Sequence, residues 1–220
     1  MKIELHCHSG ETSICGKVEA KELVRLHKEA GYDAVVVTDH YNEENVEQFT
    51  GTAEEKITQW LQGYESMKAE GEKAGIRVFF GIEARLPDCD NDYLLFGASP
   101  SFLYENPELH HMTLPDFYEL CEKEGVLIIQ AHPFRPGCHL ADLSYLHGIE
   151  VCNGNPRHNS HNDLAQEIAA EHPELICTAG SDFHQVMDID RCPVYMEDAG
   201  SEKELAEQLK KKNVNFEQIV

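Results

Sequence analysis

The sequence predicts an α/β protein built around a closed barrel of parallel strands. Short β-rich apolar runs alternate with amphipathic segments along the chain, which implies parallel pairing through right-handed crossovers. About seven such runs fit into 220 residues, and no Gly-x-Gly-x-x-Gly motif follows the first of them. These observations favour a barrel in a single domain, residues 1–220, over an open nucleotide-binding sheet.

The first half of the chain shows the alternation clearly. The first strand, residues 2–6, is apolar and leads directly into "HCH". A helix is expected over 18–30, because apolar residues recur there at helical spacing and Gly31 follows as a C-cap. The β-branched run "DAVVVTDH" (33–40) is typical of a strand buried on both faces. The stretch 53–74 predicts a long amphipathic helix.

The second half continues in the same way. Short apolar runs predict the further strands at 76–84, 92–98, 126–133, 148–153, 175–184 and 192–196. Amphipathic segments predict the further helices at 114–124, 160–172 and 201–212. The last of these begins with Ser201 and Glu204 in the capping-box pattern, and we expect it to close the barrel.

The net charge excludes some classes of partner. The chain has 18 basic and 40 acidic residues, a formal charge of −22. A field of this sign repels nucleic-acid phosphates and anionic membranes, so we expect neither as a partner. An anionic small substrate would be accepted only where bound cations reverse the local charge.

The eight cysteines are scattered and include no CxxC pair. The chain also shows no signal peptide at its start and no apolar run long enough to cross a bilayer. We therefore expect a cytoplasmic protein with reduced cysteines, most of them buried as small apolar residues. Cys7 and Cys15 are set apart by their position beside the first histidines.

The two histidines of "HCH" raise the question of a metal site. In an extended chain His6 and His8 point the same way and Cys7 points opposite. Two imidazoles on one face can share an ion, although such a pair taken alone is more often an ordinary polar strand terminus.

Other predicted strands end in the same kind of residue. The carboxyl ends of parallel barrel strands meet at one face, where working residues gather. Each of these fragments is weak evidence alone, but strand ends chosen at random would rarely all carry His, Asp or Glu. The residues concerned are His6, His8, His40 in "TDH", Glu83 in "GIE", His132 in "AHP", and Asp182 and His184 in "GSDFH".

The residue types indicate which ions would bind. Imidazole together with carboxylate suits zinc, manganese or iron and disfavours calcium or magnesium. Seven such ligands exceed what one catalytic ion takes, so more than one ion is implied, with Glu83 as the natural bridge. A pair of ions can hold a hydroxide that acts as the nucleophile and can clamp the oxygens of a phosphoryl or acyl centre.

In their order and spacing, "HCH", "TDH", "GIE", "AHP" and "GSDFH" resemble the PHP (polymerase and histidinol phosphatase) superfamily over residues 3–184. The resemblance implies a distorted TIM-like (β/α)7 barrel, two or three divalent ions (Zn, Mn or Fe) and hydrolysis of phosphate esters. It implies a first ion held by His6, His8, Glu83 and Asp182, a second by Glu83 and His132, and a third by His40 and His184.

Two positions depart from the family pattern. The family has a further ligand shortly after the His-x-His pair, where "SGETSIC" offers Glu11 first and Cys15 as a substitute. It also has a histidine in the strand after the bridging glutamate. Here that strand reads "NDYLLFG", and Tyr93 or Asp92 lies nearest. We therefore expect the second ion to be weakly held, coordinated differently or absent.

Arginines beside the ligands are the candidates for binding substrate. Arg135 follows His132 by three residues, and Arg157 follows another strand end. Either guanidinium could pair with a phosphate or with a neighbouring carboxylate, and the sequence favours neither alternative. Asn153 could contact substrate, although capping of the next helix is its commoner role.

The leading hypothesis is a metal-dependent phosphoesterase that acts on a small phosphorylated substrate, as a phosphatase or a phosphodiesterase. Glu83, Asp182, His184 and Arg135 are expected to take part in the reaction directly. The alternatives are an amidohydrolase or lactonase on a similar barrel, and a non-catalytic metal-binding module with a regulatory role. The sequence leaves the oligomeric state open.

Overall fold

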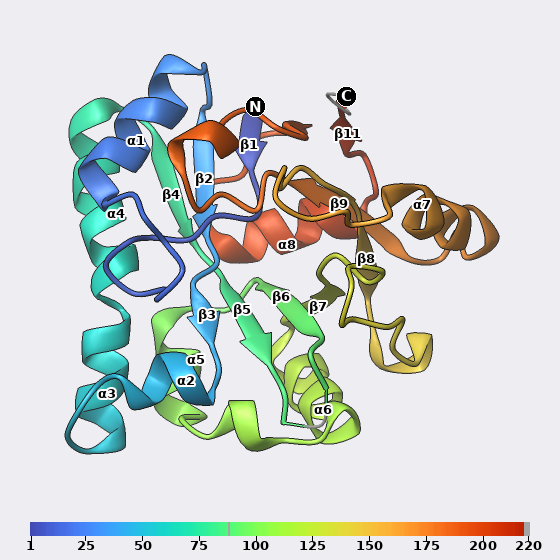
Figure 1. Ribbon diagram of the computed structural model, residues 1–220, viewed down its shortest axis with the longest axis horizontal. Helices are drawn as coiled ribbons and strands as arrows, with labels where there is room; N and C mark the ends of the chain where they lie inside the picture. The colour runs from blue at the N-terminus through green and yellow to red at the C-terminus, as the bar shows by residue number, and fades with distance from the viewer. Residues whose placement is uncertain (88, 218–220) are drawn as a thin grey trace.

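The computed structural model describes residues 1–87 and 89–217 and shows a ring of strands with helices packed around it (Figure 1). One sheet has the strand order β11-β10-β1-β2-β4, and the other has the order β3-β5-β6-β7-β8-β9. The strands are β1 (Lys2–Glu4), β2 (Ala34–Val37), β3 (His40–Tyr41), β4 (Arg77–Phe80), β5 (Ile82–Arg85), β6 (Asp92–Phe96), β7 (Leu127–Gln130), β8 (Gly148–Asn153), β9 (Ile176–Gly180), β10 (Val194–Tyr195) and β11 (Asn215–Phe216).

Helices connect most of these strands and cover the ring. The α-helices are α1 (Ala20–Glu29), α2 (Glu43–Glu47), α3 (Ala53–Trp60), α4 (Gln62–Ala74), α5 (Pro100–Glu105), α6 (Leu114–Glu124), α7 (Asn162–Glu171) and α8 (Glu202–Lys210). Three short 3-10 helices are η1 (Leu109–His111), η2 (Leu143–Tyr145) and η3 (Val186–Asp188). The predicted fold class, a distorted α/β barrel, is confirmed.

The two sheets join because strands run from one into the other. β2 pairs with β4, and a few residues later β3 pairs with β5 in the same parallel sense. On the other side, the end of the first strand meets the end of β9: the His8 amide donates to the Phe183 carbonyl at 2.9 Å, and the Phe183 amide donates to the His6 carbonyl at 3.1 Å. These pairings bring the first and last barrel strands together.

Gly180 makes this close approach feasible. A Cβ atom at position 180 would lie 2.5 Å from the Cβ of His6 and 3.0 Å from its amide nitrogen. Any larger residue would push β9 away from the strand that carries His6. The glycine of "GSDFH" therefore sets the spacing between two strand ends that carry candidate ligands.

β6 departs from the expected parallel arrangement. It runs antiparallel to both β5 and β7. Only six residues, 86–91, connect β5 to β6, whereas a parallel crossover needs about a dozen or more. As a result Asp92, the first residue of β6, lies opposite Arg85 at the end of β5 rather than at the far end of the barrel.

Two expected elements are divided in the structure. The strand predicted at 76–84 becomes β4 and β5, separated at Gly81, where a Cβ atom would lie 2.7 Å from Cγ1 of Val36. The helix predicted at 53–74 becomes α3 and α4, which meet at Leu61. The helices expected at 18–30, 114–124, 160–172 and 201–212 correspond to α1, α6, α7 and α8.

β2 is buried on both faces, as its continuous apolar run predicts. Val35 and Val37 of β2 belong to an apolar cluster that includes residues of α1, α4 and α6. Ala34 and Val36 of the same strand belong to a second cluster, which includes Leu205 of α8. The helix expected to close the barrel thus packs its apolar face against the strands.

The expectation of reduced cysteines is wrong for one pair. Cys152 at the end of β8 and Cys192 before β10 form a disulfide, with their Cα atoms 6.3 Å apart. Sequence pattern could not predict this pair, because the two residues are 40 positions apart and meet only through the tertiary fold. Among the described residues, no helix is both long and apolar enough to cross a membrane. The cytoplasmic location stays a prediction.

We expect Leu205→Ala to lower the free energy of unfolding by about 2–5 kcal/mol, because it removes a fully buried side chain from the cluster under the strands. Urea denaturation measures this change. Lys203→Ala, at an exposed position of the same helix, is the matched control and should change stability by less than about 0.5 kcal/mol. A cost below about 1 kcal/mol for Leu205→Ala would show that α8 does not pack as described.

His27 should make stability depend on pH. Burial lowers the pKa of this side chain to about 4, against a backbone hydrogen bond to Leu23 that raises it. Below pH 6.5 the His27 side chain becomes protonated in the unfolded chain but stays neutral in the folded chain. The free energy of unfolding therefore falls as the pH is lowered towards 4. The loss attributable to His27 should be about 2 kcal/mol between pH 7 and pH 5.

Urea denaturation at the two pH values tests this expectation. His27→Gln should reduce the pH dependence by that amount, whereas His172→Gln, at the half-exposed end of α7, should retain it. Equal slopes for wild type and His27→Gln would refute the assignment.

Candidate metal centre

The ends of several strands bring histidines and carboxylates into one buried cluster. Nε2 of His6 lies 3.1 Å from Oε1 of Glu83, and Nε2 of His8 lies 3.2 Å from Oε2 of the same residue. Both histidine nitrogens also lie 3.4 Å from Oδ1 of Asp182. The solvent-exposed fraction of each of these four residues is 1% or less.

Glu83 occupies the middle of the cluster. Besides the two N-terminal histidines, it lies 3.3 Å from Nε2 of His132 through Oε1 and 2.9 Å from Nδ1 of His40 through Oε2. The pairing of β3 with β5 places His40 directly opposite Glu83. A carboxylate that meets four imidazoles with its two oxygens is placed as a bridge between two ion positions.

His184 completes the cluster on the side of His8. The centroids of these two rings are 4.2 Å apart. Nδ1 of His184 is 2.8 Å from the carbonyl oxygen of Asp182, which orients the ring and directs Nε2 to Sγ of Cys15 at 3.1 Å. Ligand atoms within 4.8 Å of one another form four groups around this centre: His6, Glu83 and His132; His6, His8 and Asp182; His8, His40 and His184; and His40, Glu83 and Asp92.

Several of these ligand atoms have no hydrogen-bond partner within the described part of the chain. They are Nε2 of His6, Nε2 of His8, Nδ1 of His40 and Oε2 of Glu83. Each lies close to an oppositely charged neighbour but without hydrogen-bond geometry. Buried polar atoms are rarely left in this way, and their convergence from separate strands fits divalent cations bound among them.

The electrostatics of the cluster favour charged side chains. Burial alone would raise the pKa of Glu83, but His6 and His40 outweigh it and hold that pKa well below its usual range. Burial would lower the pKa of His6, but the carboxylates of Glu83 and Asp182 raise it well above the usual value. The carboxylates of Glu83 and Asp182 therefore favour positive charge at this depth, and a bound cation would supply that charge in place of the protons on the imidazoles.

Glu150 positions two of the ligands, and the sequence analysis missed it. Its Oε1 lies 2.9 Å from Nδ1 of His6, and its Oε2 accepts hydrogen bonds from the His132 amide and from Nδ2 of Asn153, both at 2.9 Å. A carboxylate on the far nitrogen of a ligand histidine fixes its orientation and tautomer. In the sequence, Glu150 could have been recognised as the single acidic residue within the apolar run 148–153.

Asp39 holds the loop that follows His8. Its oxygens accept hydrogen bonds from the amide and hydroxyl of Ser9 and from the hydroxyl of Ser13, each at 2.7 Å. Ser13 in turn accepts from the His40 amide at 3.1 Å. Asp39 therefore fixes the backbone next to His8 and next to His40 without forming a hydrogen bond to either side chain.

Two ligands sit in left-handed backbone conformations. The φ angle is 30° at His132 and 52° at Asp182. Such angles are unfavourable for residues with a Cβ atom and persist where the surrounding structure enforces them. Here the enforcing contacts include the hydrogen bond from the His132 amide to Glu150.

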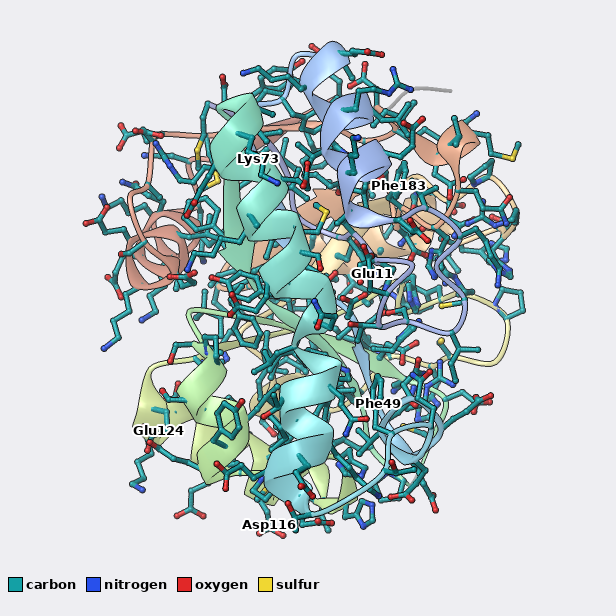
Figure 2. The ribbon with its side chains drawn as sticks, turned by 90° about the vertical axis from the view of Figure 1, so that its left-hand side faces the viewer. Glu11, Phe49, Lys73, Asp116, Glu124 and Phe183 are labelled. Atoms are coloured by element: carbon teal, nitrogen blue, oxygen red, sulfur yellow. A yellow bond between two sulfur atoms is a disulfide. The ribbon has the colours of Figure 1, made fainter. Side chains whose placement is uncertain are left out.

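The structure does not bring Glu11 to the cluster. Glu11 lies on the loop before α1 (Figure 2), where its Oε1 accepts a hydrogen bond from the Ala20 amide at 2.9 Å and so caps that helix. Its capping role accounts for the difference, because it directs the carboxylate to the helix N-terminus. The substitute, Cys15, lies instead beside His184 and is half-buried. Burial would raise the pKa of the Cys15 thiol, but hydrogen bonds with His184 and His40 lower it to about 5.

At the position of the absent family histidine, Asp92 is the nearer candidate. Its Oδ2 lies 3.8 Å from Nε2 of His132, while Arg85 donates to both of its oxygens at 2.7 and 2.8 Å. Tyr93 points the other way, into the core against Phe117. The reversed direction of β6 is what places Asp92 at this face.

Arg135 lies at the cluster, whereas Arg157 lies at its edge. Nη2 of Arg135 donates to Oδ2 of Asp182 at 2.5 Å and to Oδ1 of Asn153 at 2.9 Å, and its Nε has no partner among the described residues. Arg157 forms an ion pair with Asp188. Asn153 lies between Arg135 and Glu150, so it connects the two and does not cap α7 with its side chain.

A cavity of about 580 Å³ opens onto the cluster. Its wall includes four basic side chains, those of Lys17, Arg85, Arg135 and Arg157, and four acidic ones, those of Glu44, Glu83, Asp92 and Asp182. In a chain with 18 basic and 40 acidic residues, this balance of charge repels an anion less than the protein as a whole does. The volume is in the range of pockets that hold small molecules.

Comparisons with known proteins bear on the fold and the family. A two-domain protein from Bacteroides vulgatus ATCC 8482, described as containing a predicted PHP-like metal-dependent phosphoesterase, superposes with a TM-score of 0.70 at 20% identity, covering 99% of this chain and 64% of that one. PsfC from Pseudomonas syringae PB-5123 superposes with a TM-score of 0.68 at 19% identity, covering 99% and 91%. At these identities the likeness shows the fold alone.

A curated relative is a DNA polymerase III of PolC type from Oceanobacillus iheyensis, 26% identical over 105 residues. The match covers 48% of this chain but only 6% of the polymerase, so the chain corresponds to a small part of that protein. The family model for the PHP domain matches residues 4–217. The chain therefore belongs to the PHP domain family.

Proposed function

We propose that the protein is a metal-dependent phosphoesterase that hydrolyses a small phosphate ester. The observation that carries the proposal is the convergence of buried, unpartnered candidate ligand atoms next to Arg135, in the wall of a cavity that opens to solvent. The net charge of −22 disfavours a nucleic-acid substrate and favours a small one that can enter this local site.

We assign the ligand sets as the family resemblance implies them, and the short distances within the cluster support the assignment. His6, His8, Glu83 and Asp182 would hold one ion, and Glu83 with His132 would hold a second, with Asp92 nearby. His40 and His184 would hold a third. Divalent ions would supply Lewis acidity at the phosphorus centre and lower the pKa of a water molecule for attack on it.

Arg135 would bind the phosphoryl oxygens. It is mostly buried, so its hydrogen bonds are poorly screened by water, and its Nε remains free for a substrate oxygen. Its contacts with Asp182 and Asn153 hold the guanidinium in place before substrate arrives. Arg157 is already paired with Asp188, which offsets part of its charge, so we assign it only a supporting role at the rim of the cavity.

Adding manganese, zinc or iron to chelator-treated protein should raise the midpoint of thermal unfolding, because an ion that binds only the folded state stabilises it. The same addition should restore hydrolysis of p-nitrophenyl phosphate. Glu83→Gln, which keeps the size but removes the bridging charge, should reduce the thermal shift and lower kcat/KM at least about 100-fold. Glu119→Gln, on the exposed face of α6, is the matched control.

The outcomes separate the alternatives. A thermal shift without turnover of any phosphate ester would favour a non-catalytic metal-binding module. Turnover of lactones or amides in place of phosphate esters would favour an amidohydrolase.

Arg135→Lys should lower kcat/KM for phosphate esters about 10- to 100-fold, because a lysine cannot make the paired hydrogen bonds of a guanidinium and each bond to a charged group contributes about 1.5–3 kcal/mol. Steady-state kinetics on the metal-loaded enzyme measure the effect. Arg25→Lys, on the surface of α1, should retain wild-type values. Unchanged kinetics for Arg135→Lys would remove this residue from the site.

A further inference from the structure

The loop that carries Cys15 is fixed against the metal centre. The Lys17 amide donates to the carbonyl of His184 at 2.9 Å, and the Ile14 amide donates to Oδ1 of Asn45 at 3.0 Å. Gly16 permits the turn between them, since a Cβ atom there would lie 2.4 Å from the carbonyl oxygen of Ser9. These contacts direct the thiol of Cys15 to the imidazole of His184 rather than to solvent.

We propose that Cys15 is a sulfur ligand of the ion held by His40 and His184, and that it makes this position selective for zinc over manganese. The inference rests on the proposed metal centre but not on phosphate-ester hydrolysis. It assigns to a cysteine the ligand position that the sequence analysis gave first to Glu11, whose carboxylate caps α1 instead.

The contacts around Cys15 support ligation. Sγ lies 3.1 Å from Nε2 of His184, and the ring atoms of His8, His40 and His184 that could bind an ion lie within 4.8 Å of one another. Nε2 of His8 is buried there without a hydrogen-bond partner among the described residues. In tetrahedral zinc sites sulfur and nitrogen ligands are about 3.5 Å apart, which is close to the distance between Sγ of Cys15 and Nε2 of His184.

The tautomer of His184 suits the same arrangement. Its Nδ1 is 2.8 Å from the carbonyl oxygen of Asp182, an acceptor, so Nδ1 carries the proton and donates it in that hydrogen bond. Nε2 is then left with its lone pair on the side of Cys15 and His8. Binding exchanges the thiol proton, released to solvent, for the metal–sulfur bond, and no oxidation is involved.

Sulfur at this position changes the choice of ion. Thiolates favour soft or borderline ions such as zinc, whereas manganese prefers oxygen ligands. The other candidate ligands at the centre are imidazoles and carboxylates, which accept either ion. Cys15 would therefore distinguish one position of the cluster from the rest.

Cobalt substitution tests the proposal without relying on activity. Metal-free protein titrated anaerobically with CoCl2 should develop a thiolate-to-cobalt charge-transfer band in the near ultraviolet. Cys15→Ser should lose this band while visible cobalt bands from the remaining positions persist. Cys138→Ser is the matched control, because Cys138 also contacts a histidine of the centre, at 3.8 Å from Nδ1 of His132, the ring nitrogen that faces away from Glu83.

Competition with a chromophoric chelator measures the selectivity. Cys15→Ser should weaken zinc binding at one position at least about tenfold. Cys15→Asp should lose the charge-transfer band and shift the preference of that position towards manganese. Retention of the band in Cys15→Ser, or its loss in Cys138→Ser alone, would overturn the proposal.

The same titration distinguishes this inference from the proposed function. Cobalt binding without any charge-transfer band in wild type would refute sulfur ligation and leave the metal-dependent phosphoesterase standing. No cobalt binding at all would refute both. A Cys15-dependent band in a protein that hydrolyses no phosphate ester would support the ligand and contradict the enzyme.

Discussion

The burial of Glu83 is the constraint on which the rest of the structure depends. A carboxylate shielded from water is costly unless opposite charge surrounds it, and Glu83 meets four histidines that approach from three other strand ends. Those histidines contact Glu83 only if the strands that carry them end at the level of Glu83 along the barrel. Strand register, the close approach at Gly180 and the carboxylate of Glu150 all serve this one requirement.

The irregular features of the barrel also help to assemble the cluster around Glu83. The short connection 86–91 reverses β6 and delivers Asp92 to the face where a parallel strand would have placed only its last residue. Arg85, directly opposite, balances the added carboxylate with two hydrogen bonds. A departure from the regular fold thus supplies an acidic group near His132, close to where the family carries a histidine.

The sequence predicted well what periodicity and strand ends determine. The buried run 33–40, the helix 114–124 and the grouping of His6, His8, Glu83, Asp182 and His184 follow from local pattern and from the rule that parallel strands end together. It could not predict features that depend on loop length or tertiary contact. The direction of β6 is one, and the placement of Glu11 at the start of α1, with Cys15 beside His184, is another, because an acid near a helix start can cap it or face a cavity. The Cys152–Cys192 bond is a third.

The left-handed backbone at His132 and Asp182 has an evolutionary consequence. Glycine or asparagine would adopt these angles at lower cost, so either replacement would relax the chain while deleting a ligand side chain. Selection for stability alone would therefore favour such replacements, which remove the side chain from the cluster. Persistence of His132 and Asp182 in a lineage would record continuous selection for these two side chains at the expense of an easier backbone.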